Sequence, residues 1–301
     1  MEIEKVLLCG LGAVGLTYAC KLKDVCELKI LADQARIERY TKNPPELNNE
    51  KISLNYITPD KTWTPDLIII TTKAQALNTV LEYIENFVSD KTTIISLING
   101  ISSEKIITEK YGKDKVLHSY FIGHSAVREN NKVFQDGVGK IVFGSPYKEN
   151  RSKVDVLADF FRENSIDYEI PEDIIYSLWL KYTLNAFSNQ ASAIMNLTFG
   201  EMKTDIFKNF ARKIINEVIL IAKAEGVQNA EMLEQDALKA LSNMVDNGKT
   251  SMLQDIMAKR KTEVDIFAGE ILRLSKKYKI TTPYNQVMYD MIKILEEKKS
   301  V

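Results

Sequence analysis

The sequence predicts an α/β fold in its first half and an all-α fold in its second half. Up to about residue 170, short apolar runs alternate with helical stretches. The first of these runs leads directly into three glycines with the spacing GxGxxG, a turn typical of the start of a doubly wound parallel sheet. Beyond Pro171 the periodicity is helical to the end of the chain.

Length and composition set the frame for this prediction. With 301 residues the chain is long enough for two domains, and we place them at residues 1–170 and 171–301. Its 40 Lys and Arg residues against 41 Asp and Glu give a net charge of −1, so no charge excess points to nucleic acid. No apolar run reaches the roughly 18 residues that would cross a bilayer.

The cysteines and histidines predict the cellular setting and the absence of a metal. The three cysteines are odd in number and lack metal-ligand spacing, which indicates reduced thiols in a cytoplasmic protein. They are Cys9, Cys20 and Cys26. His118 and His124 are the only histidines, so we expect no metal site.

The glycine motif lies between an apolar run at residues 5–9 and a helical stretch at residues 16–22. It consists of Gly10, Leu11, Gly12, Ala13, Val14 and Gly15. The first glycine permits a tight turn, the second lets the backbone approach a pyrophosphate, and the third lets the helix pack on the strand. The helix N-terminus then offers N–H groups to the phosphates. We therefore predict a Rossmann-type dinucleotide site, the alternative being a glycine turn of structural use only.

A second strand is expected at residues 28–31, and Asp33 follows it. An acidic residue about 20 positions beyond the glycine motif is typical of NAD sites, where it binds the ribose 2′-hydroxyl. Arg36 could instead meet the 2′-phosphate of NADP. Asp33 also suits the N-cap of a helix over residues 35–40. The two residues point to different cofactors, and both possibilities stay open here.

Two further buried strands end in polar residues. They are expected at residues 66–73 and 92–98, the first ending in Lys73 and the second leading into Asn99. Because the carboxyl ends of parallel strands face the ligand crevice, both residues are candidates for cofactor contact. The alternatives are a solvated lysine and an ordinary Asn-Gly turn.

The remaining elements follow the same alternation and then become helical. In the first half we expect strands at residues 116–122 and 139–143 and helices at residues 74–87, 102–111 and 152–164. In the second half we expect helices at residues 177–195, 207–225, 230–245 and 250–278, and a last helix after Pro283.

The helix at residues 177–195 is apolar nearly all round, as a buried helix is. Lys181, Asn185 and Asn189 nevertheless recur on it at a spacing of four, which places them on one face. A cation and two amides are costly to bury unless polar groups meet them. They are either satisfied by neighbouring helices or form the wall of an active site with Lys181 as its acid.

The whole chain resembles the ketopantoate reductase (2-dehydropantoate 2-reductase) family. The resemblance rests on the glycine motif, Thr72-Lys73-Ala74, Asn99-Gly100, Lys181 with Asn185 and Asn189, and the segments Ser251-Met252-Leu253-Gln254-Asp255 and Thr262-Glu263-Val264-Asp265. The polar helix and the last two segments are far more specific than the glycine motif. The family makes pantoate for pantothenate and coenzyme A, so the resemblance implies hydride transfer from NAD(P)H to a 2-oxo acid.

The resemblance also implies roles for individual residues. Lys181 matches the general acid that protonates the carbonyl oxygen, and Glu263 matches a glutamate of the active-site network. The matching substrate contacts are Asn185, Asn189 and Ser251. Asn99 matches an asparagine near the nicotinamide end, which makes it a candidate for both cofactor and substrate contact. The chemistry agrees, because hydride addition to a ketone builds negative charge on oxygen that a nearby cation must meet.

Two positions depart from the family pattern. The family commonly prefers NADPH and often carries a basic residue just after the second strand, where this chain has Ala32-Asp33 and only later Arg36. Phe199 stands where some members have another polar substrate contact. We expect NADPH, with NADH as the alternative, and either ketopantoate or another 2-oxo acid as substrate.

A non-catalytic dinucleotide sensor is a hypothesis of another class. The retained Lys181, Asn185, Asn189, Ser251 and Glu263 argue against it, because a sensor needs no acid. The helical half offers a surface on which a homodimer could form, and we expect neither nucleic acid nor a membrane as partner.

Overall fold

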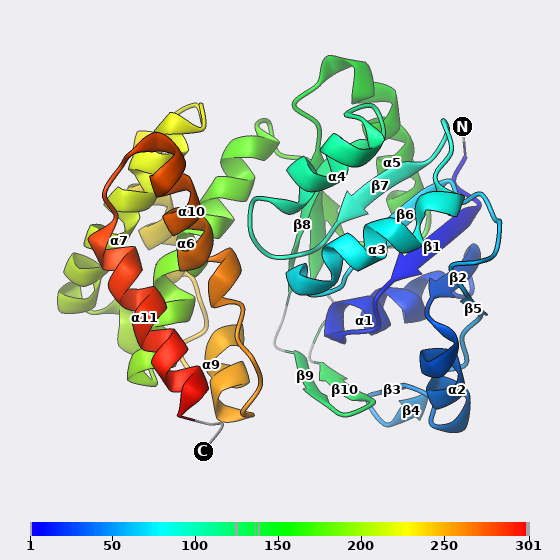
Figure 1. Ribbon diagram of the computed structural model, residues 1–301, viewed down its shortest axis with the longest axis horizontal. Coiled ribbons are helices and arrows are strands. Elements are labelled where there is room, and N and C mark those ends of the chain that lie inside the picture. Colours follow the sequence, from blue (N-terminus) through cyan, green and yellow to red (C-terminus); the bar gives the residue numbers. More distant parts are fainter. Residues whose placement is uncertain (1, 124–125, 136, 138, 299–301) are drawn as a thin grey trace. The chain divides into compact units, whose positions relative to one another are not determined.

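The computed structural model describes residues 2–123, 126–135, 137 and 139–298 of the chain (Figure 1). The chain divides into two compact units, Met1–Ile174 and Ile175–Val301. The first unit combines a sheet with helices and the second is helical, so the predicted fold class is confirmed. Among the described residues, no helix is long and apolar enough to cross a membrane.

The first unit is built on an eight-stranded sheet with the order β12-β11-β8-β7-β6-β1-β2-β5. Its strands are β1 (Lys5–Cys9), β2 (Glu27–Leu31), β5 (Tyr56–Ile57), β6 (Leu67–Ile70), β7 (Thr93–Ser96), β8 (Val116–Ile122), β11 (Lys140–Gly144) and β12 (Tyr168–Glu169). Neighbours are parallel except β8 and β11. The chain runs from β1 to β2 on one side and later returns to β6 on the other. The sheet is therefore doubly wound, with its switch point between β1 and β6.

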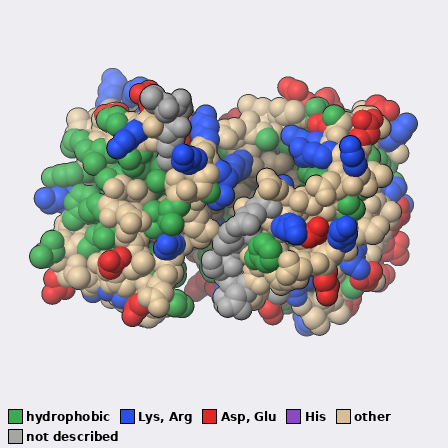
Figure 2. Space-filling model, turned by 90° about the horizontal axis from the view of Figure 1, so that it is seen from below, with side chains coloured by type: hydrophobic (Ala, Val, Ile, Leu, Met, Phe, Trp, Pro, Cys, Tyr) green, Lys and Arg blue, Asp and Glu red, His purple; other side chains and the backbone are tan. Residues whose placement is uncertain are grey.

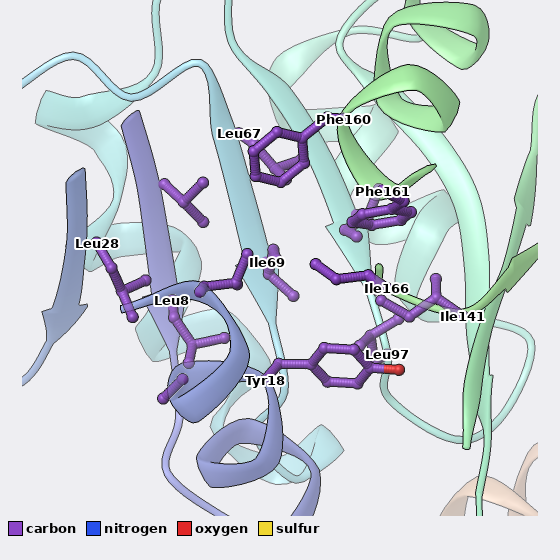
Figure 3. Close-up of a cluster of buried hydrophobic side chains, with 14 of the residues drawn as sticks. Leu8, Tyr18, Leu28, Leu67, Ile69, Leu97, Ile141, Phe160, Phe161 and Ile166 are labelled. Atoms are coloured by element: carbon purple, nitrogen blue, oxygen red, sulfur yellow. The ribbon is translucent and has the colours of Figure 1, made fainter. Parts of the chain in front are cut away.

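Helices cover both faces of this sheet, which explains why the central strands β1, β6 and β7 are buried along nearly their whole length. Consecutive residues of β1 point to opposite faces, so Leu8 and Leu7 belong to different cores. The face of Leu8 also holds Ile69, Tyr18, Phe160 and Phe161 (Figure 3). The face of Leu7 also holds Ile68, Ile70, Leu77 and Ile107. Burying each such side chain contributes about 1.5–3 kcal/mol.

The helices of this unit follow the predicted alternation. They are α1 (Ala13–Leu22), α2 (Gln34–Lys42), α3 (Leu77–Tyr83), α4 (Ser103–Tyr111) and α5 (Arg151–Glu163). The helix expected at residues 74–87 is shorter than predicted, because 3₁₀ turns at Ala74–Ala76 and Glu85–Phe87 flank α3. Such tight turns are frequent at helix ends.

A small second sheet was not predicted. Its order is β4-β3-β10-β9, with β3 (Glu46–Leu47), β4 (Glu50–Lys51), β9 (Ala126–Glu129) and β10 (Lys132–Gln135). The hairpin between β3 and β4 turns at Asn48 and Asn49, both with positive φ, of 49° and 70°. Asparagine tolerates this conformation better than most residues, and a two-residue turn of this kind joins antiparallel strands. The Asn-Asn pair is thus the sequence signal that could have revealed the hairpin.

The second unit contains six helices within the described range. They are α6 (Ile174–Met195), α7 (Asp205–Ala224), α8 (Leu233–Ser242), α9 (Ser251–Met257), α10 (Ala268–Tyr278) and α11 (Pro283–Glu297). The α7 helix begins where the Thr204 hydroxyl accepts a hydrogen bond from the Phe207 N–H. This N-cap satisfies one of the four free N–H groups of the first turn.

The single long helix predicted at residues 250–278 is wrong. The structure has α9, then a 3₁₀ turn at Val264–Ile266, then α10. Lys259 adopts a left-handed conformation with φ of 53°, and the next N–H, of Arg260, donates to the Asp255 carbonyl at 2.8 Å. This arrangement ends a helix in the way that glycine usually does. Because no glycine stands at this position, the sequence gives little warning of the break.

The last helix has a buried face and, next to it, an exposed apolar face. Asn285, Met288 and Ile292 are buried on one of them. On the other, the exposed side chains of α11 are Tyr284, Val287, Met291 and Ile294. Figure 2 shows that hydrophobic side chains reach the surface of this unit. The apolar surface of α11 is therefore wider than the part of it that is buried within the helical unit.

Candidate functional site

The glycine motif forms a sterically constrained turn at the end of β1. Gly10 has a φ of 109°, and a Cβ there would lie 2.9 Å from the Thr72 Cγ2. A Cβ on Gly15 would lie 2.0 Å from the Gly10 carbonyl oxygen. At Gly12 the nearest atom to such a Cβ would be 3.9 Å away. Packing therefore requires glycine at Gly10 and Gly15, whereas Gly12 leaves open space in front of the backbone.

The start of α1 is suited to an anion. Gly12 is its N-cap, no side chain caps the helix, and the first turn contains no acidic residue. The first N–H groups of a helix without a side-chain cap need an acceptor, and the helix dipole favours negative charge there. Together with the space at Gly12, these N–H groups fit the diphosphate of a dinucleotide.

Thr71 locks the turn and was not singled out from the sequence. Its hydroxyl donates to the Gly10 carbonyl at 2.8 Å and to the Cys9 carbonyl at 3.2 Å. Its N–H also donates to the Cys9 carbonyl, at 2.8 Å. Thr71 thereby ties the end of β1 to the end of β6. A threonine at the end of a buried strand was the only signal available, and many strands end in this way.

Asp33 caps a helix, which is one of the two roles that the sequence allows for it. It is the N-cap of α2, and its Oδ1 accepts a hydrogen bond from the Arg36 N–H at 2.8 Å. Its Oδ2 lies 3.5 Å from the Arg36 Nε. The side chain of Arg36 is 56% exposed. The carboxylate is thus engaged by its own helix, and an accessible cation stands beside it.

Lys73 and Asn99 lie at the same edge of the sheet as the glycine motif. Lys73 is exposed after β6, and Asn99 is half-buried in the loop after β7. Because β1, β6 and β7 are adjacent and parallel, their carboxyl ends meet at one edge. The predicted juxtaposition of Gly10, Lys73 and Asn99 at this edge is present in the structure, and their roles stay predictions.

In the helical unit, α6 carries two kinds of polar side chain. Thr183 and Ser188 are buried, and their hydroxyls donate to carbonyls of the preceding turn, at 2.7 Å and 2.6 Å. Asn185 is half-buried and Asn189 is 4% exposed. Within the described part of the chain, neither amide has a hydrogen-bond partner. Lys181 is half-buried one turn before Asn185. For the two amides, therefore, neighbouring helices within the described residues do not supply the hydrogen-bond partners that the first of the two alternatives requires.

Ser251 and Glu263 stand at the ends of short elements in the same unit. The Thr250 hydroxyl accepts from the Leu253 N–H at 3.2 Å and so caps α9, which leaves Ser251 exposed in the first turn. Glu263 is half-buried and precedes the 3₁₀ turn at Val264–Ile266. Its position is fixed by its neighbours.

The α11 helix holds the segment before and after Glu263, at Thr262 and Asp265. The N–H and hydroxyl of Thr262 donate to the Glu296 Oε1 at 2.7 Å and 2.6 Å. Asp265 lies 2.9 Å from the Lys293 Nζ and accepts from the Tyr289 hydroxyl at 3.0 Å. Burial acts to raise the pKa of Asp265, but these hydrogen bonds and the Lys293 charge outweigh it and hold the pKa below its usual value. Asp265 is thus engaged in supporting this segment.

The helix of Lys181 is joined directly to the segment of Glu263. Tyr182 is 1% exposed, and its hydroxyl donates to the Phe267 carbonyl at 2.7 Å. Burial raises the pKa of this phenol well above its usual value. Tyr182 was missed at the sequence level because an apolar helix offers many buried aromatic residues and nothing marks this one.

Where the structure describes them, the metal-ligating residue types do not cluster. Among the residues with described positions, no three His, Cys, Asp or Glu side chains are grouped closely enough to hold a metal ion. His118 lies on β8, and His124 falls outside the described residues.

Comparison with known proteins gives matches over nearly the whole chain. Two family models match, "Ketopantoate reductase PanE/ApbA" at residues 6–147 and "Ketopantoate reductase PanE/ApbA C terminal" at residues 173–296. The 2-dehydropantoate 2-reductase of Streptococcus pyogenes serotype M3 is 25% identical over 296 residues, covering 95% of this chain and 96% of that protein. The 2-dehydropantoate 2-reductase of Pyrococcus horikoshii is 28% identical over 297 residues and 97% of each chain.

A solved structure has the same fold. The ternary structure of D-mandelate dehydrogenase with NADH and anilino(oxo)acetate superimposes with a TM-score of 0.87. It is 23% identical and covers 99% of this chain and 100% of its own. The two-part fold described above is therefore shared with a known dehydrogenase.

Proposed function

The chain belongs to the ketopantoate reductase family of NAD(P)H-dependent oxidoreductases, and from that premise we propose that it reduces 2-dehydropantoate to pantoate with NADPH. The observation that carries the proposal is the pair of amides on α6, Asn185 and Asn189. The buried hydroxyls of Thr183 and Ser188 bond carbonyls of their own helix, whereas these two amides offer donors and acceptors to a ligand. A small acid with carboxylate and hydroxyl groups matches them.

Lys181 is the proposed proton donor. When bound, NADPH would supply the hydride for the new C–H bond at the carbonyl carbon and would itself be oxidised to NADP⁺. The electron pair of the carbonyl π bond then moves onto oxygen, and the Lys181 ammonium donates a proton there. The product is an alcohol and a neutral amine, which regains its proton from water. A positioned cation of this kind lowers the barrier because it meets the charge as it develops.

Asn185, Asn189 and Ser251 are the proposed substrate contacts, and Glu263 belongs to the same network. An amide can both donate to a carboxylate and accept from a hydroxyl, so two amides can fix the orientation of a hydroxy-substituted 2-oxo acid. Ser251 stands in the first turn of α9, where its hydroxyl is exposed. Glu263 is held from both sides by the contacts of Thr262 and Asp265 with α11.

The cofactor half of the proposal rests on the end of β1 and its neighbours. The uncapped N-terminus of α1 and the open space at Gly12 would hold the diphosphate. Arg36 would meet the 2′-phosphate, and Lys73 adds a second cation at the same edge of the sheet. Asn99 would contact the nicotinamide end. The capping role of Asp33 supports NADPH, because the carboxylate is already occupied by its helix.

A different 2-oxo acid is the second candidate, and Phe199 is the observation that favours it. Its N–H donates to the Gly248 carbonyl at 3.0 Å, and its ring lies so close to Gly248 that a Cβ there would be 2.8 Å from the Phe199 Cδ2. Gly248 lies just before Thr250 and Ser251. An aromatic ring packed against Gly248, on the segment that leads into Ser251, would suit a substrate with an apolar group, such as the aryl group of the ligand bound to D-mandelate dehydrogenase.

Cofactor oxidation followed by absorbance, with a panel of 2-oxo acids, separates the two candidates. We expect the highest kcat/KM with ketopantoate. A preference of about 200-fold or more for an aryl or branched 2-oxo acid over ketopantoate would favour the second candidate, since that ratio exceeds the roughly 10- to 200-fold that one methylene confers. No oxidation with any member of the panel would contradict both.

A further inference from the structure

A buried carboxylate lies next to the loop of Asn99 and has no part in the chemistry described above. Glu104, in the first turn of α4, is 2% exposed. Around it are three buried serines, Ser96 at 0%, Ser103 at 3% and Ser119 at 0% exposure. A charged group is costly to bury unless hydrogen bonds satisfy it, so the arrangement of these four residues needs an explanation.

The cluster begins where β7 and β8 stop pairing. The backbone register between them ends at Ile95 and Leu117. At the next position the Ser96 N–H donates instead to the Ser119 Oγ at 3.0 Å, and that hydroxyl donates to the Ser96 carbonyl at 2.8 Å. A side chain thus replaces the backbone ladder, and the two strands remain tied at the carboxyl end of β7.

From Ser96 the hydrogen bonds continue to the carboxylate. The Ser96 hydroxyl donates to the Ser103 Oγ at 3.1 Å, and the Ser103 hydroxyl donates to the Glu104 Oε2 at 2.9 Å. The Ser119 N–H points to the other oxygen, Oε1, at 3.5 Å. An ionised acceptor at the end of a hydroxyl chain orients every hydroxyl in it and strengthens each bond.

This chain of bonds fastens both ends of one loop. Ser96 precedes residues 97–102 and Ser103 follows them. Within the loop, the Leu97 N–H donates to the Ile70 carbonyl at 2.8 Å, the Ile98 N–H points to the Ser96 Oγ at 3.4 Å, and Gly100 has a φ of 105°. Asn99 is half-buried on this loop.

We propose that Glu104 is a positioning residue for the hydride transfer, which acts by fixing the loop that presents Asn99. This inference rests on the proposed function, because it takes Asn99 to contact the nicotinamide or the substrate. The carboxylate itself touches neither. It accepts from β8 and, through Ser103 and Ser96, from β7, so the loop is held against both strands.

Replacing Glu104 by glutamine tests the charge without changing the shape. The Ser119 N–H is a fixed donor and requires the amide oxygen at its side. The NH₂ group then faces Ser103, whose hydroxyl must turn its proton toward Ser96. The bond between Ser103 and Ser96 therefore reverses, and the buried Ser96 hydroxyl loses the acceptor that Ser103 provided. Glu109→Gln, on an exposed position of the same helix, is the matched control.

Hydrogen exchange followed by mass spectrometry measures the loop directly and does not depend on activity. We expect the amides of residues 97–102 to exchange about fivefold faster or more in Glu104→Gln, which is the effect of losing roughly one hydrogen bond. Glu109→Gln should leave them unchanged. Unchanged exchange in Glu104→Gln would overturn the proposal whatever the activity.

A double-mutant cycle then connects the loop to catalysis. Glu104→Gln should lower kcat/KM roughly 10- to 100-fold, as misplacement of a contact by about 1 Å does. Added to Asn99→Ala it should cause no further loss, because it acts through Asn99. Losses that multiply would overturn the proposal. If the loop loosens while both single variants keep full kcat/KM, the role of Asn99 in the proposed function fails and the positioning role fails with it.

Discussion

The Tyr182 hydroxyl donates a 2.7 Å hydrogen bond to the Phe267 carbonyl, and both residues are 1% exposed. The bond joins α6, which carries Lys181, to the segment that follows Glu263. The rings of Tyr182 and Phe267 also lie near each other, with centroids 6.2 Å apart. One buried contact thus ties together two parts of the helical unit that are far apart in sequence.

Removing this hydroxyl should destabilise the helical unit. Tyr182→Phe leaves the Phe267 carbonyl buried without its donor, which costs about 1–3 kcal/mol. Denaturant unfolding should show a lower midpoint with an unchanged slope. Tyr284→Phe, at a residue that is 41% exposed, should leave the midpoint within error. Equal midpoints for Tyr182→Phe and wild type would mean that water or another donor replaces the hydroxyl.

Lys181→Ala should remove most turnover and leave cofactor binding intact. A general acid contributes roughly 100- to 10,000-fold to the rate, and Lys181 lies on a different unit of the chain from the glycine motif. The measurements are kcat and the NADPH dissociation constant from fluorescence titration. Lys223→Ala, at an exposed position of α7, is the control. Near wild-type turnover in Lys181→Ala would reject Lys181 as the acid.

Asn185→Ala, Asn189→Ala and Ser251→Ala should each raise the substrate KM. Hydrogen bonds to a charged group are worth about 1.5–3 kcal/mol, which corresponds to roughly 10- to 100-fold. Cofactor affinity should not change. Ser188→Ala is the matched control on the same helix, because the Ser188 hydroxyl is spent on the Leu184 carbonyl at 2.6 Å. Normal substrate kinetics in all three variants would show that the polar face does not meet the substrate.

The stability of the first unit should fall as the pH is lowered from about 6.5 to about 4. Burial lowers the pKa of His118 from 6.5 to about 4, and its Nδ1 has no hydrogen-bond partner. Between these values the unfolded chain binds a proton that the native state does not, so acid favours unfolding. Each pKa unit is worth about 1.4 kcal/mol, so the loss is ~3 kcal/mol. The measurement is the free energy of unfolding in urea at several pH values across this range. In His118→Asn the slope of this free energy against pH should be smaller by the equivalent of one proton. Equal slopes in the variant and wild type would contradict the assignment.

Local patterns in the sequence were sufficient for the main features of the first unit. The glycine motif is read from six consecutive residues, and packing in the structure requires glycine at Gly10 and Gly15. The strands that lead into Lys73 and Asn99 were predicted from apolar runs alone, and adjacency of parallel strands brings both residues to the edge that holds Gly10. Short-range information is enough wherever a motif or a buried run determines the backbone.

Features that depend on distant residues were not predictable in this way. The small second sheet pairs Glu46 with Lys132, and strands of two to four residues carry too little periodicity to be recognised. The break after α9 depends on a left-handed Lys259 where glycine would be expected. Thr71 and Tyr182 are ordinary residue types whose importance comes from carbonyls far along the chain. For Asp33 the sequence left two orientations open, and only coordinates distinguish them.

The orientation of Asp33 leads to the last prediction, which concerns the choice of cofactor. Because its Oδ1 accepts from the Arg36 N–H at 2.8 Å, the carboxylate serves the helix and the Arg36 guanidinium beside it is left for a 2′-phosphate. We expect wild type to favour NADPH over NADH in kcat/KM. Arg36→Ala should lower kcat/KM for NADPH roughly 10- to 100-fold, the value of a charge-assisted contact, with little change for NADH. Arg39→Ala, one turn further along α2, is the control.

Asp33→Ser separates the two roles of the carboxylate. Serine still caps the helix but carries no charge. If the carboxylate only caps, this variant should keep its thermal stability and its preference for NADPH within about twofold, whereas Asp33→Ala should lose about 0.5–2 kcal/mol of stability. If the carboxylate instead binds a ribose 2′-hydroxyl and repels phosphate, wild type will favour NADH, and Asp33→Ser will weaken NADH use while improving NADPH use. That pattern would assign Asp33 to cofactor selection and remove Arg36 from it.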